Sequence, residues 1–274
     1  MSVLAIPYHN IDPVALDLGF FSIRWYGLAY LSGLMLGWFY IRKLISDAKY
    51  WGGTAPMDKD AADDLLIWIT FGVVLGGRLG FVLFYEPLYF IGNPLDAFKI
   101  WQGGMSFHGG LLGTAFAIYL FSRRYKVSLF STADLVAAAV PIGIFFGRIA
   151  NFINGGLYGR VSDVPWAMPF PAGGDQPRHP SQLYEAFLEG IVVFFLLRFL
   201  IFNRLALAKP GLIAGTFLVS YAIGRSISEI FRQSEDGHLL NWGPFTAGMV
   251  YSIPMALFGI YFIVQAVKQQ RVAA

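Results

Sequence analysis

The most informative polar residues of this 274-residue chain stand at the end of an apolar run, just before a glycine-rich segment. Arg148, Asn151 and Asn154 fall on the last turns of the helix that this run predicts. An ionisable group inside such a helix usually faces a partner, a cavity or a bound ligand. Arg148 and Asn151 share one helix face, so they could hold one anionic group between them.

A second arginine stands in a later apolar run. One face of the predicted helix carries four polar residues at helical spacing: Tyr221, Arg225, Glu229 and Arg232. Two interpretations remain open. Either Arg225 and Glu229 form a structural ion pair at the helix end, or this face lines a cavity in which Glu229 turns Arg225 towards an anion.

A histidine flanked by glycines is a candidate proton acceptor. His108 lies in the glycine-rich segment 103–110, where the small neighbours leave an imidazole accessible to a ligand. An unperturbed imidazole titrates at about pH 6.5 and suits proton abstraction. The alternative is an interfacial histidine bonded to backbone. Two interpretations are equally open for Arg78: it has a structural role and pairs with a carbonyl or an acid, or it touches a substrate.

The elements that position these residues are predicted to be membrane helices. Apolar residues make up 56% of the chain, charged residues only 14%, and the mean hydropathy is clearly positive. A bilayer core about 30 Å thick needs about 20 mainly apolar residues per helix. We therefore expect an all-α integral membrane protein with one catalytic domain, residues 1–274. Its seven predicted spans are approximately residues 20–43, 64–85, 106–122, 132–153, 182–202, 211–231 and 244–267.

The distribution of Lys and Arg predicts the orientation. Of the 20 basic residues, twelve fall on one side, at or beyond the span ends, four fall on the other side, and Arg24, Arg78, Arg148 and Arg225 lie within the predicted spans. Because the more basic side faces the cytoplasm, the N-terminus is expected in the periplasm and the C-terminus in the cytoplasm. Residues 155–181 then form a loop-rich periplasmic cap, residues 46–63 a cytoplasmic loop, and residues 1–19 a segment along the outer interface.

This orientation gathers the polar residues at one depth. Tyr26, His108 and Glu185 come early in three spans that begin at the outer face. Arg148 lies roughly 9 Å below the outer boundary at 1.5 Å per residue, and Arg225 lies at a comparable depth. Such a set of groups suits a substrate with an anionic head and apolar tails, which is the chemistry of a phospholipid.

Composition excludes several functional classes. The chain has no cysteine, so any thiol must come from a substrate. The four histidines lack the spacing of helical metal ligands, and no metal or other cofactor is expected. The net charge of +3 comes from basic residues dispersed through loops, so no nucleic-acid partner is expected. No basic residue precedes Arg24, so no cleavable signal peptide is expected.

The motifs taken together resemble those of bacterial prolipoprotein diacylglyceryl transferases. The strongest match is the segment 147–159, which contains Arg148 and Asn151. The other matching segments, in chain order, are 24–27, 76–78, 105–110, 179–185 and 221–232. One departure is Gly156, because the family pattern usually has a glutamate at this place.

The resemblance implies an activity and its partners. Enzymes of this family transfer the diacylglyceryl group of phosphatidylglycerol to the lipobox cysteine thiol of a prolipoprotein. They form a thioether and release glycerol phosphate in the first step of bacterial lipoprotein maturation. The implied partners are phosphatidylglycerol, the prolipoprotein signal peptide and membrane lipids. The implied location is the bacterial inner membrane, with the active site towards the periplasmic leaflet.

The resemblance also implies roles for individual residues. Arg148 and Arg225 would surround the phosphate and His108 would be the base. The implied substrate-binding residues are Arg148, Tyr26, Asn151, Asn154, Gly159, Glu185, Tyr221 and Glu229. If the family glutamate orients an arginine, either Glu185 or Glu229 must do so here, or the role is dispensable.

Two other functional classes compete with this hypothesis. A transporter or flippase for an anionic lipid could use the same arginines, but its sequence would more naturally show broken helices in two related halves. The sequence shows no such repeat. A membrane scaffold would not need arginines clustered at one depth.

The predicted orientation can be tested with reporter fusions. A reporter that is active only in the periplasm should be active when it is inserted between residues 155 and 181 and inactive when it is fused to the C-terminus. The reverse pattern of activity would overturn the orientation and the depths derived from it.

Overall fold

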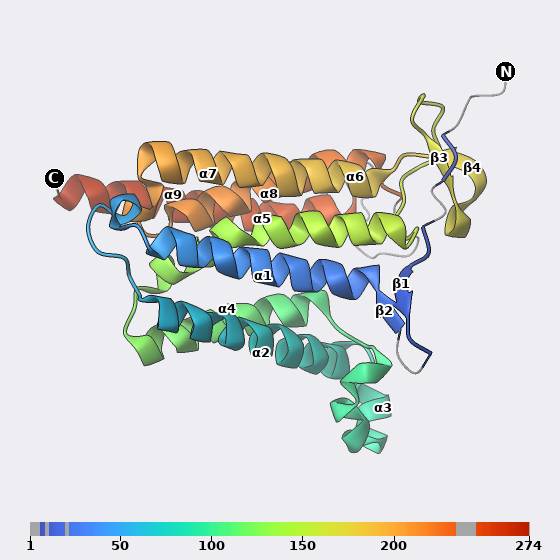
Figure 1. Cartoon of the computed structure of the whole chain (residues 1–274), viewed down its shortest axis with the longest axis horizontal. Helices are drawn as coiled ribbons and strands as arrows, with labels where there is room; N and C mark the ends of the chain where they lie inside the picture. The colour runs from blue at the N-terminus through green and yellow to red at the C-terminus, as the bar shows by residue number, and fades with distance from the viewer. Residues whose placement is uncertain (1–5, 9–10, 20–21, 234–244, 274) are drawn as a thin grey trace.

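The computed structural model describes residues 6–8, 11–19, 22–233 and 245–273 and consists mainly of long helices that run roughly parallel (Figure 1). The four short strands lie at one end of the bundle, which we call the cap end. The strands are β1 (Val14–Asp17), β2 (Ser22–Arg24), β3 (Met168–Phe170) and β4 (Gly174–Arg178). The main helices are α1 (Trp25–Ile45), α2 (Lys59–Phe84), α3 (Pro87–Gly92), α4 (Phe107–Tyr125), α5 (Leu129–Ile153), α6 (Ser181–Glu185), the π-helical η5 (Ala186–Val192), α7 (Val193–Arg204), α8 (Leu212–Phe231) and α9 (Ala247–Ala273). The short 3₁₀ turns are η1 (Ala48–Trp51), η2 (Pro94–Phe98), η3 (Ile100–Gln102), η4 (Pro171–Gly173) and η6 (Ala206–Ala208).

Each of the seven predicted spans overlaps a long helix, and the fifth overlaps the continuous run of α6, η5 and α7. Residues 20–21 and 244, at the starts of the first and last predicted spans, lie outside the described residues. Three helices of the described part are long and apolar enough by themselves to cross a membrane: Lys59–Phe84, Leu129–Ile153 and Ala247–Gln269. The fold is therefore that of a helical membrane protein.

Two predicted boundaries were wrong. Arg24 was placed inside the first span, but it ends β2 in an extended conformation and α1 begins only after it. Its neighbourhood is a hairpin, because β1 pairs antiparallel with β2. Residues 46–63 were expected to form a loop, whereas α2 begins at Lys59. The Asp58 side chain accepts a hydrogen bond from Ala61 N (2.8 Å) and so caps the first turn of the helix.

Helices α2 and α4 pack through glycines. A Cβ atom at Gly113 would lie 2.2 Å from the Gly72 carbonyl oxygen, and one at Gly76 would lie 2.4 Å from the Gly109 carbonyl oxygen. No side chain fits at these distances, so the two backbones touch directly. Gly109 and Gly113 stand four residues apart, the small-residue spacing that lets membrane helices pack closely.

A buried carboxylate fixes the start of α8. Asp134 on α5 accepts hydrogen bonds from the backbone N–H groups of Gly211 and Ala214, each at 2.7 Å, and its side chain is fully buried. These N–H groups have no partner within their own helix, and the helix N-terminus favours a negative charge. Asp134 therefore sets the position of α8 along α5, which matters because each of these helices carries one of the candidate arginines.

The segment between α5 and α6 ties the cap to the helix ends. It is loop-rich and contains the antiparallel pair β3 and β4. The backbone N–H of Arg160 donates to the Phe231 carbonyl (2.9 Å) at the end of α8. The Tyr8 hydroxyl donates to the carbonyls of Phe152 and Ile153 at the end of α5, at 2.8 and 3.0 Å. The cap thus holds α5 and α8 together where the candidate arginines lie.

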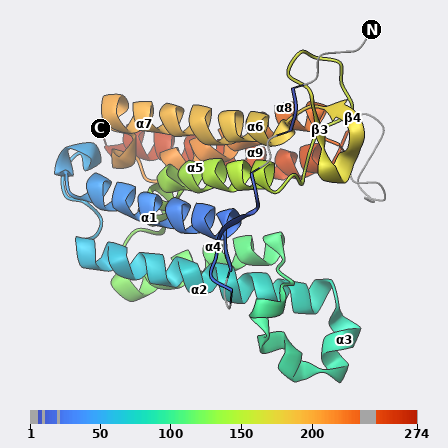
Figure 2. The same ribbon diagram turned by 45° about the vertical axis from the view of Figure 1, so that its right-hand side comes forward.

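The apolar core lies towards the other end of the bundle. Its fully buried members include Leu44, Leu65, Phe121, Leu135, Ile201 and Ile213. Figure 2 shows that α3 and the turns next to it project sideways from the bundle near the cap end. The cap half of the molecule holds the buried carboxylates Glu185, Glu189 and Glu229.

Candidate active site

Arg148 and Arg225 meet inside the cap half of the bundle. Arg148 projects from α5, Arg225 projects from α8, and both contact the carboxylate of Glu185 at the end of α6. Arg148 Nη1 lies 3.3 Å from Glu185 Oε2, and Arg225 Nη1 donates a hydrogen bond to Glu185 Oε1. Glu185 is fully buried. One carboxylate therefore joins the two arginines that the sequence places at similar depth.

Two further carboxylates and one further guanidinium complete this group. Glu189 Oε2 lies 3.2 Å from Arg148 Nη2, and Glu229 Oε2 lies 2.7 Å from Arg225 Nη2. Arg232 Nη1 lies 3.7 Å from Glu185 Oε1. We call the group the arginine–carboxylate cluster, which consists of Arg148, Arg225, Arg232, Glu185, Glu189 and Glu229.

The charges of the cluster balance within the described residues, at three guanidiniums and three carboxylates. A buried ion needs such partners, because removing one member leaves an uncompensated charge in a low dielectric. Glu189 Oε1 and Glu229 Oε2 are buried and have no hydrogen bond of ordinary geometry in the described part of the chain. The carboxylates thus hold the arginines by charge and by hydrogen bonds from Arg148 to Glu189 and from Arg225 to Glu185.

The π-helical segment η5 brings Glu189 into the cluster. π-Helical turns are rare and occur often at functional sites. Gly190 lets η5 approach α5 closely, because a Cβ atom there would lie 2.9 Å from Phe145 Cβ. Phe145 stands one turn before Arg148 on α5. The wide turn and the glycine together place the fully buried carboxylate of Glu189 beside Arg148.

Two tyrosines that the sequence singled out also face Arg148. Tyr221 on α8 interacts electrostatically with Arg148, Arg225 and the cluster carboxylates. Tyr26, in the first turn of α1, is exposed, has its ring centroid 5.1 Å from that of Tyr30 in a tilted arrangement, and interacts electrostatically with Arg148. The structure therefore brings Glu185 and both arginines together, and Tyr26 and Tyr221 interact electrostatically with Arg148.

Two predicted substrate-binding asparagines differ in their surroundings. Asn151 follows Arg148 by one turn of α5 and is half-buried. Asn154 ends that helix, is exposed and lines a cavity of about 550 Å³ together with Tyr8, Ile11, Asp12, Pro13, Ile153 and Pro171. None of the six cluster residues lines that cavity. The structure thus separates Asn154 from the arginines, because its backbone already belongs to the turn out of α5.

Gly159 serves the cap through its backbone. It bridges to Arg232, and its N–H donates to the His179 carbonyl at 2.9 Å. A Cβ atom there would lie 2.5 Å from the Phe231 carbonyl oxygen, so only glycine fits. Gly159 therefore positions Arg232 and the end of α8.

The cap also contains a short hydrogen-bond chain. Trp166 Nε1 donates to the Tyr184 hydroxyl at 2.6 Å, and His179 Nδ1 lies 3.0 Å from the same oxygen. Burial lowers the pKa of His179 below its ordinary value. A neutral His179 with its proton on Nε2 would accept the Tyr184 proton at Nδ1, which fixes Tyr184 next to Glu185.

His108 lies outside the cluster. It occupies the first turn of α4, where Ser106 accepts a hydrogen bond from Gly109 N (3.1 Å) and caps the helix. The imidazole is exposed, and its ring centroid lies 5.4 Å from that of Tyr251 on α9. In the described part of the chain, no ion pair, hydrogen bond or ring contact joins His108 to an arginine. Helix α9 nevertheless links the two, because a Cβ atom at Gly248, one turn before Tyr251, would lie 3.2 Å from Arg225 Nη2.

Arg78 has a structural role. Its guanidinium donates to four backbone carbonyls, at 2.6 Å to Asp96 and Gly103, 2.8 Å to Ala97 and 3.1 Å to Gly104. It also packs against the rings of Phe81 and Phe90. Of the two interpretations left open for Arg78, the structure supports pairing with carbonyls. Arg78 holds the polypeptide from α3 to the start of α4.

Comparison with known proteins decides the family. The family model described as prolipoprotein diacylglyceryl transferase matches residues 13–265, which include the whole arginine–carboxylate cluster. The chain belongs to this family. As a member of the prolipoprotein diacylglyceryl transferase family, it is similar over nearly its full length to relatives named phosphatidylglycerol–prolipoprotein diacylglyceryl transferase. It is 52% identical to the relative from Rhizobium meliloti over 265 residues, which cover 95% of this chain and 94% of the relative.

Other members of the family are similar to the same degree. The relative from Nitrobacter winogradskyi is 50% identical over 266 residues, which cover 96% of this chain and 91% of the relative. The relative from Rhodopseudomonas palustris is 48% identical over 273 residues, which cover 99% of this chain and 95% of the relative.

Gly156 is this family member's departure from the expected pattern, and the structure shows how the cluster manages without an acid there. A Cβ atom at Gly156 would meet no atom within 4 Å, and its carbonyl accepts a hydrogen bond from Gln182 Nε2 at 2.6 Å. The arginines are instead contacted by Glu185, Glu189 and Glu229. This agrees with the expectation that Glu185 or Glu229 orients an arginine.

Glu189 was missed from the sequence. It lies inside an apolar span four residues after Glu185, so the two acids share a face of an ideal helix. An acid within a membrane helix is by itself a signal of a partner or a ligand. This signal singled out Arg148 in the fourth span, and it would have identified Glu189 if it had been applied to the fifth.

Glu189 can be tested by a neutral replacement of similar shape. Glu189→Gln should destabilise the protein by about 3 kcal/mol, because it leaves the buried cluster with three guanidiniums and only two carboxylates. For a chain of this size that loss lowers the unfolding midpoint by on the order of 10 °C. The measurement is thermal unfolding in detergent, with the exposed Glu86→Gln as control. Equal midpoints for both variants would contradict a charged role for Glu189.

Proposed function

We propose that this chain transfers the diacylglyceryl group of phosphatidylglycerol to the lipobox cysteine thiol of prolipoproteins; its relatives are named phosphatidylglycerol–prolipoprotein diacylglyceryl transferase. The products are a thioether and glycerol phosphate. The observation that carries the proposal is the pair of guanidiniums, Arg148 and Arg225, that three carboxylates hold side by side in the cap half of the bundle. Such a place suits a phosphate that enters from the bilayer.

The guanidiniums keep donors for that phosphate. An arginine carries five N–H donors in a planar fork. Arg148 contacts Glu185 and Glu189 through its two terminal nitrogens, and Arg225 contacts Glu185 and Glu229 through its own. Each guanidinium therefore retains N–H groups beyond those that face carboxylates. The carboxylates orient each guanidinium from one side, and the phosphate binds its remaining N–H donors. Both guanidiniums keep their positive charge in a low dielectric.

The reaction breaks the bond between glycerol carbon and phosphate oxygen. The cysteine thiol loses its proton to His108, or to a water that His108 orients. The sulfur then attacks the glycerol carbon attached to the phosphate, and the electron pair of the broken bond leaves on the phosphate oxygen. Arg148 and Arg225 stabilise the negative charge that develops there. Positive groups also favour the thiolate, since a free thiol titrates only at about pH 8.5.

The placement of His108 fits two substrates that meet at α9. The exposed imidazole faces Tyr251, whereas Gly248 on the same helix faces Arg225 and Glu229. The lipid phosphate would bind on the side of the cluster and the thiol would approach on the side of His108. Tyr26 and Tyr221, which interact with Arg148, would bind the head group of the lipid.

The same proposal includes the topology and the location. All seven long helical runs cross the bacterial inner membrane, and the cap end with the cluster faces the periplasmic leaflet. The excess of basic residues in the loops at the opposite end supports this orientation. The signal peptide approaches from the membrane with its lipobox cysteine at the outer surface.

The phosphate role can be tested with arginine variants. Arg148→Ala should lower the rate about a hundredfold or more, because it removes donors aimed at the developing charge. The rate of Arg148→Lys should lie between those of the unchanged protein and Arg148→Ala, since lysine keeps the positive charge but lacks the planar set of paired N–H donors. The measurement is mass spectrometry of the diacylglyceryl adduct on a lipobox peptide, with phosphatidylglycerol as donor and the exposed Arg123→Ala as control. Full activity of Arg148→Ala would refute the role.

The base can be tested by the pH dependence of the rate. His108→Gln should slow the reaction, and the rate should rise only at higher pH. The reason is that the thiol must then ionise without a base, at about pH 8.5. Rates are measured between about pH 6 and 9 with saturating peptide. The unfolding midpoint of the variant serves as control for folding. An unchanged rate across this range would show that His108 is not the base.

A further inference from the structure

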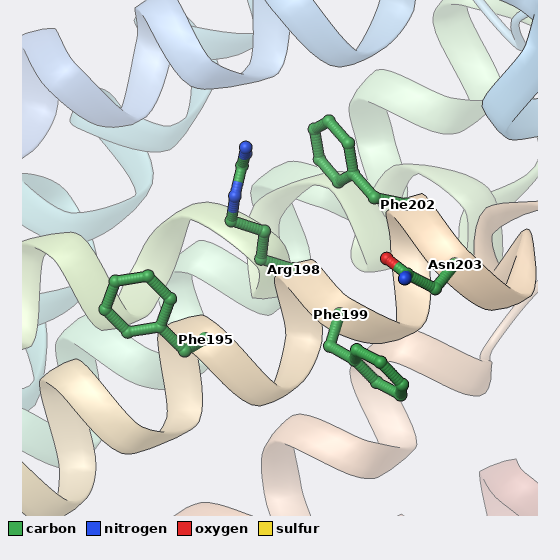
Figure 3. Close-up of a pocket in the computed structure, with 5 residues that line it drawn as sticks. All are labelled: Phe195, Arg198, Phe199, Phe202 and Asn203. Atoms are coloured by element: carbon green, nitrogen blue, oxygen red, sulfur yellow. The ribbon is translucent and has the colours of Figure 1, made fainter.

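A groove lies on α7, beyond the arginine–carboxylate cluster towards the other end of the bundle. Its lining residues all belong to this helix: Phe195, Arg198, Phe199, Phe202 and Asn203 (Figure 3). Its volume is about 340 Å³. Arg198 and Phe202 extend to one side of the helix and Phe199 extends to the other. A charged group thus stands among aromatic rings on a helix of the membrane bundle.

The charge of Arg198 lacks a counter-charge in the described part of the chain. No ion pair of the described residues includes it, in contrast to Arg148, Arg225 and Arg232. Its guanidinium carbon lies 4.1 Å from the Phe202 ring centroid. Its guanidinium also interacts with the buried Tyr40 hydroxyl, both electrostatically and as a hydrogen-bond partner. A ring face and a neutral hydroxyl do not balance a full positive charge.

The depth of Arg198 makes this imbalance costly. It stands six residues before the end of α7 at Arg204, which is about 9 Å along the helix axis. Phe195 and Phe199 beside it expose 61% and 50% of their surface, so they face acyl chains in a membrane. An arginine at such a place needs a partner from its surroundings, and the bilayer itself offers anionic phosphate.

We propose that this groove binds an anionic phospholipid of the leaflet at this end of the bundle. Arg198 holds the phosphate through two parallel N–H donors, and the Asn203 amide supplies another donor. The acyl chains lie along Phe195 and Phe199. A zwitterionic lipid binds less well, because its ammonium group meets the positive charge of Arg198. The site is separate from the cluster and does not depend on the proposed reaction.

The test uses photoreactive lipids and the full chain in phosphatidylcholine nanodiscs. The probes are a photoreactive phosphatidic acid and a photoreactive phosphatidylcholine, and the labelled peptides are mapped by mass spectrometry. The variants are Arg198→Gln, Arg198→Lys and the control Arg204→Gln, an exposed arginine at the end of the same helix. Arg148→Ala separates this site from the cluster.

The proposal predicts that phosphatidic acid labels residues 195–203 and that Arg198→Gln lowers this labelling about fivefold, the effect of one basic residue near the membrane surface. Arg204→Gln and Arg148→Ala should keep it, and Arg198→Lys should lower it less than Arg198→Gln does, since lysine keeps the charge but loses the paired donors. Equal labelling by the two lipids, or labelling that Arg198→Gln leaves unchanged, would overturn the proposal. An equal loss in Arg204→Gln would also overturn it, since it would indicate general attraction to a basic surface. If Arg198→Gln does not fold, unlabelled lipids serve as competitors of the photoreactive phosphatidic acid. Unlabelled phosphatidic acid should then compete at about a tenfold lower concentration than unlabelled phosphatidylcholine, on the order of the affinity ratio that one charge gives. Equal competition by the two lipids would overturn the proposal.

Discussion

The whole arrangement depends on one constraint, which is that arginines inside a membrane protein need counter-charges. Arg148 and Arg225 lie on different helices, and Glu185 contacts both of them. Glu189 and Glu229 add one carboxylate to each arginine. Several features of the fold serve this group: the π-helical turn that presents Glu189, the Asp134 cap that sets the position of α8, and the backbone of Gly159 that ties the end of α8 to the cap.

The carboxylates and the guanidiniums of the cluster have different tasks. The carboxylates fix the guanidiniums in place and balance their charge before a substrate arrives. In the proposed function the guanidiniums then offer their remaining donors to a phosphate without having to move far, which is preorganisation for a charge that develops during the reaction. The proposed proton acceptor, His108, belongs to another helix, α4, and in the described part of the chain α9 carries residues beside both groups. The lipid and the thiol can therefore reach the reacting centre from different sides.

The sequence was sufficient for the helices and for the meeting of Arg148, Arg225 and Glu185, because apolar runs and the distribution of basic residues carry that information. It did not reveal contacts that depend on loops. The four carbonyls around Arg78 and the tight backbone contacts of Gly159 arise from segments without a periodic pattern. The early start of α2 was missed although Asp58 is a good capping residue. Glu189 was missed although an acid in an apolar span is a clear signal.

The central claim is that Arg148 and Arg225 together bind the phosphate of one lipid. The most direct test is an experimental structure of the full chain with phosphatidylglycerol bound. Guanidinium nitrogens of both arginines are expected within about 3 Å of oxygens of the same phosphate, while the cluster carboxylates keep their contacts with the arginines. A head group that is bound elsewhere, or that contacts only one of the two arginines, would contradict the account.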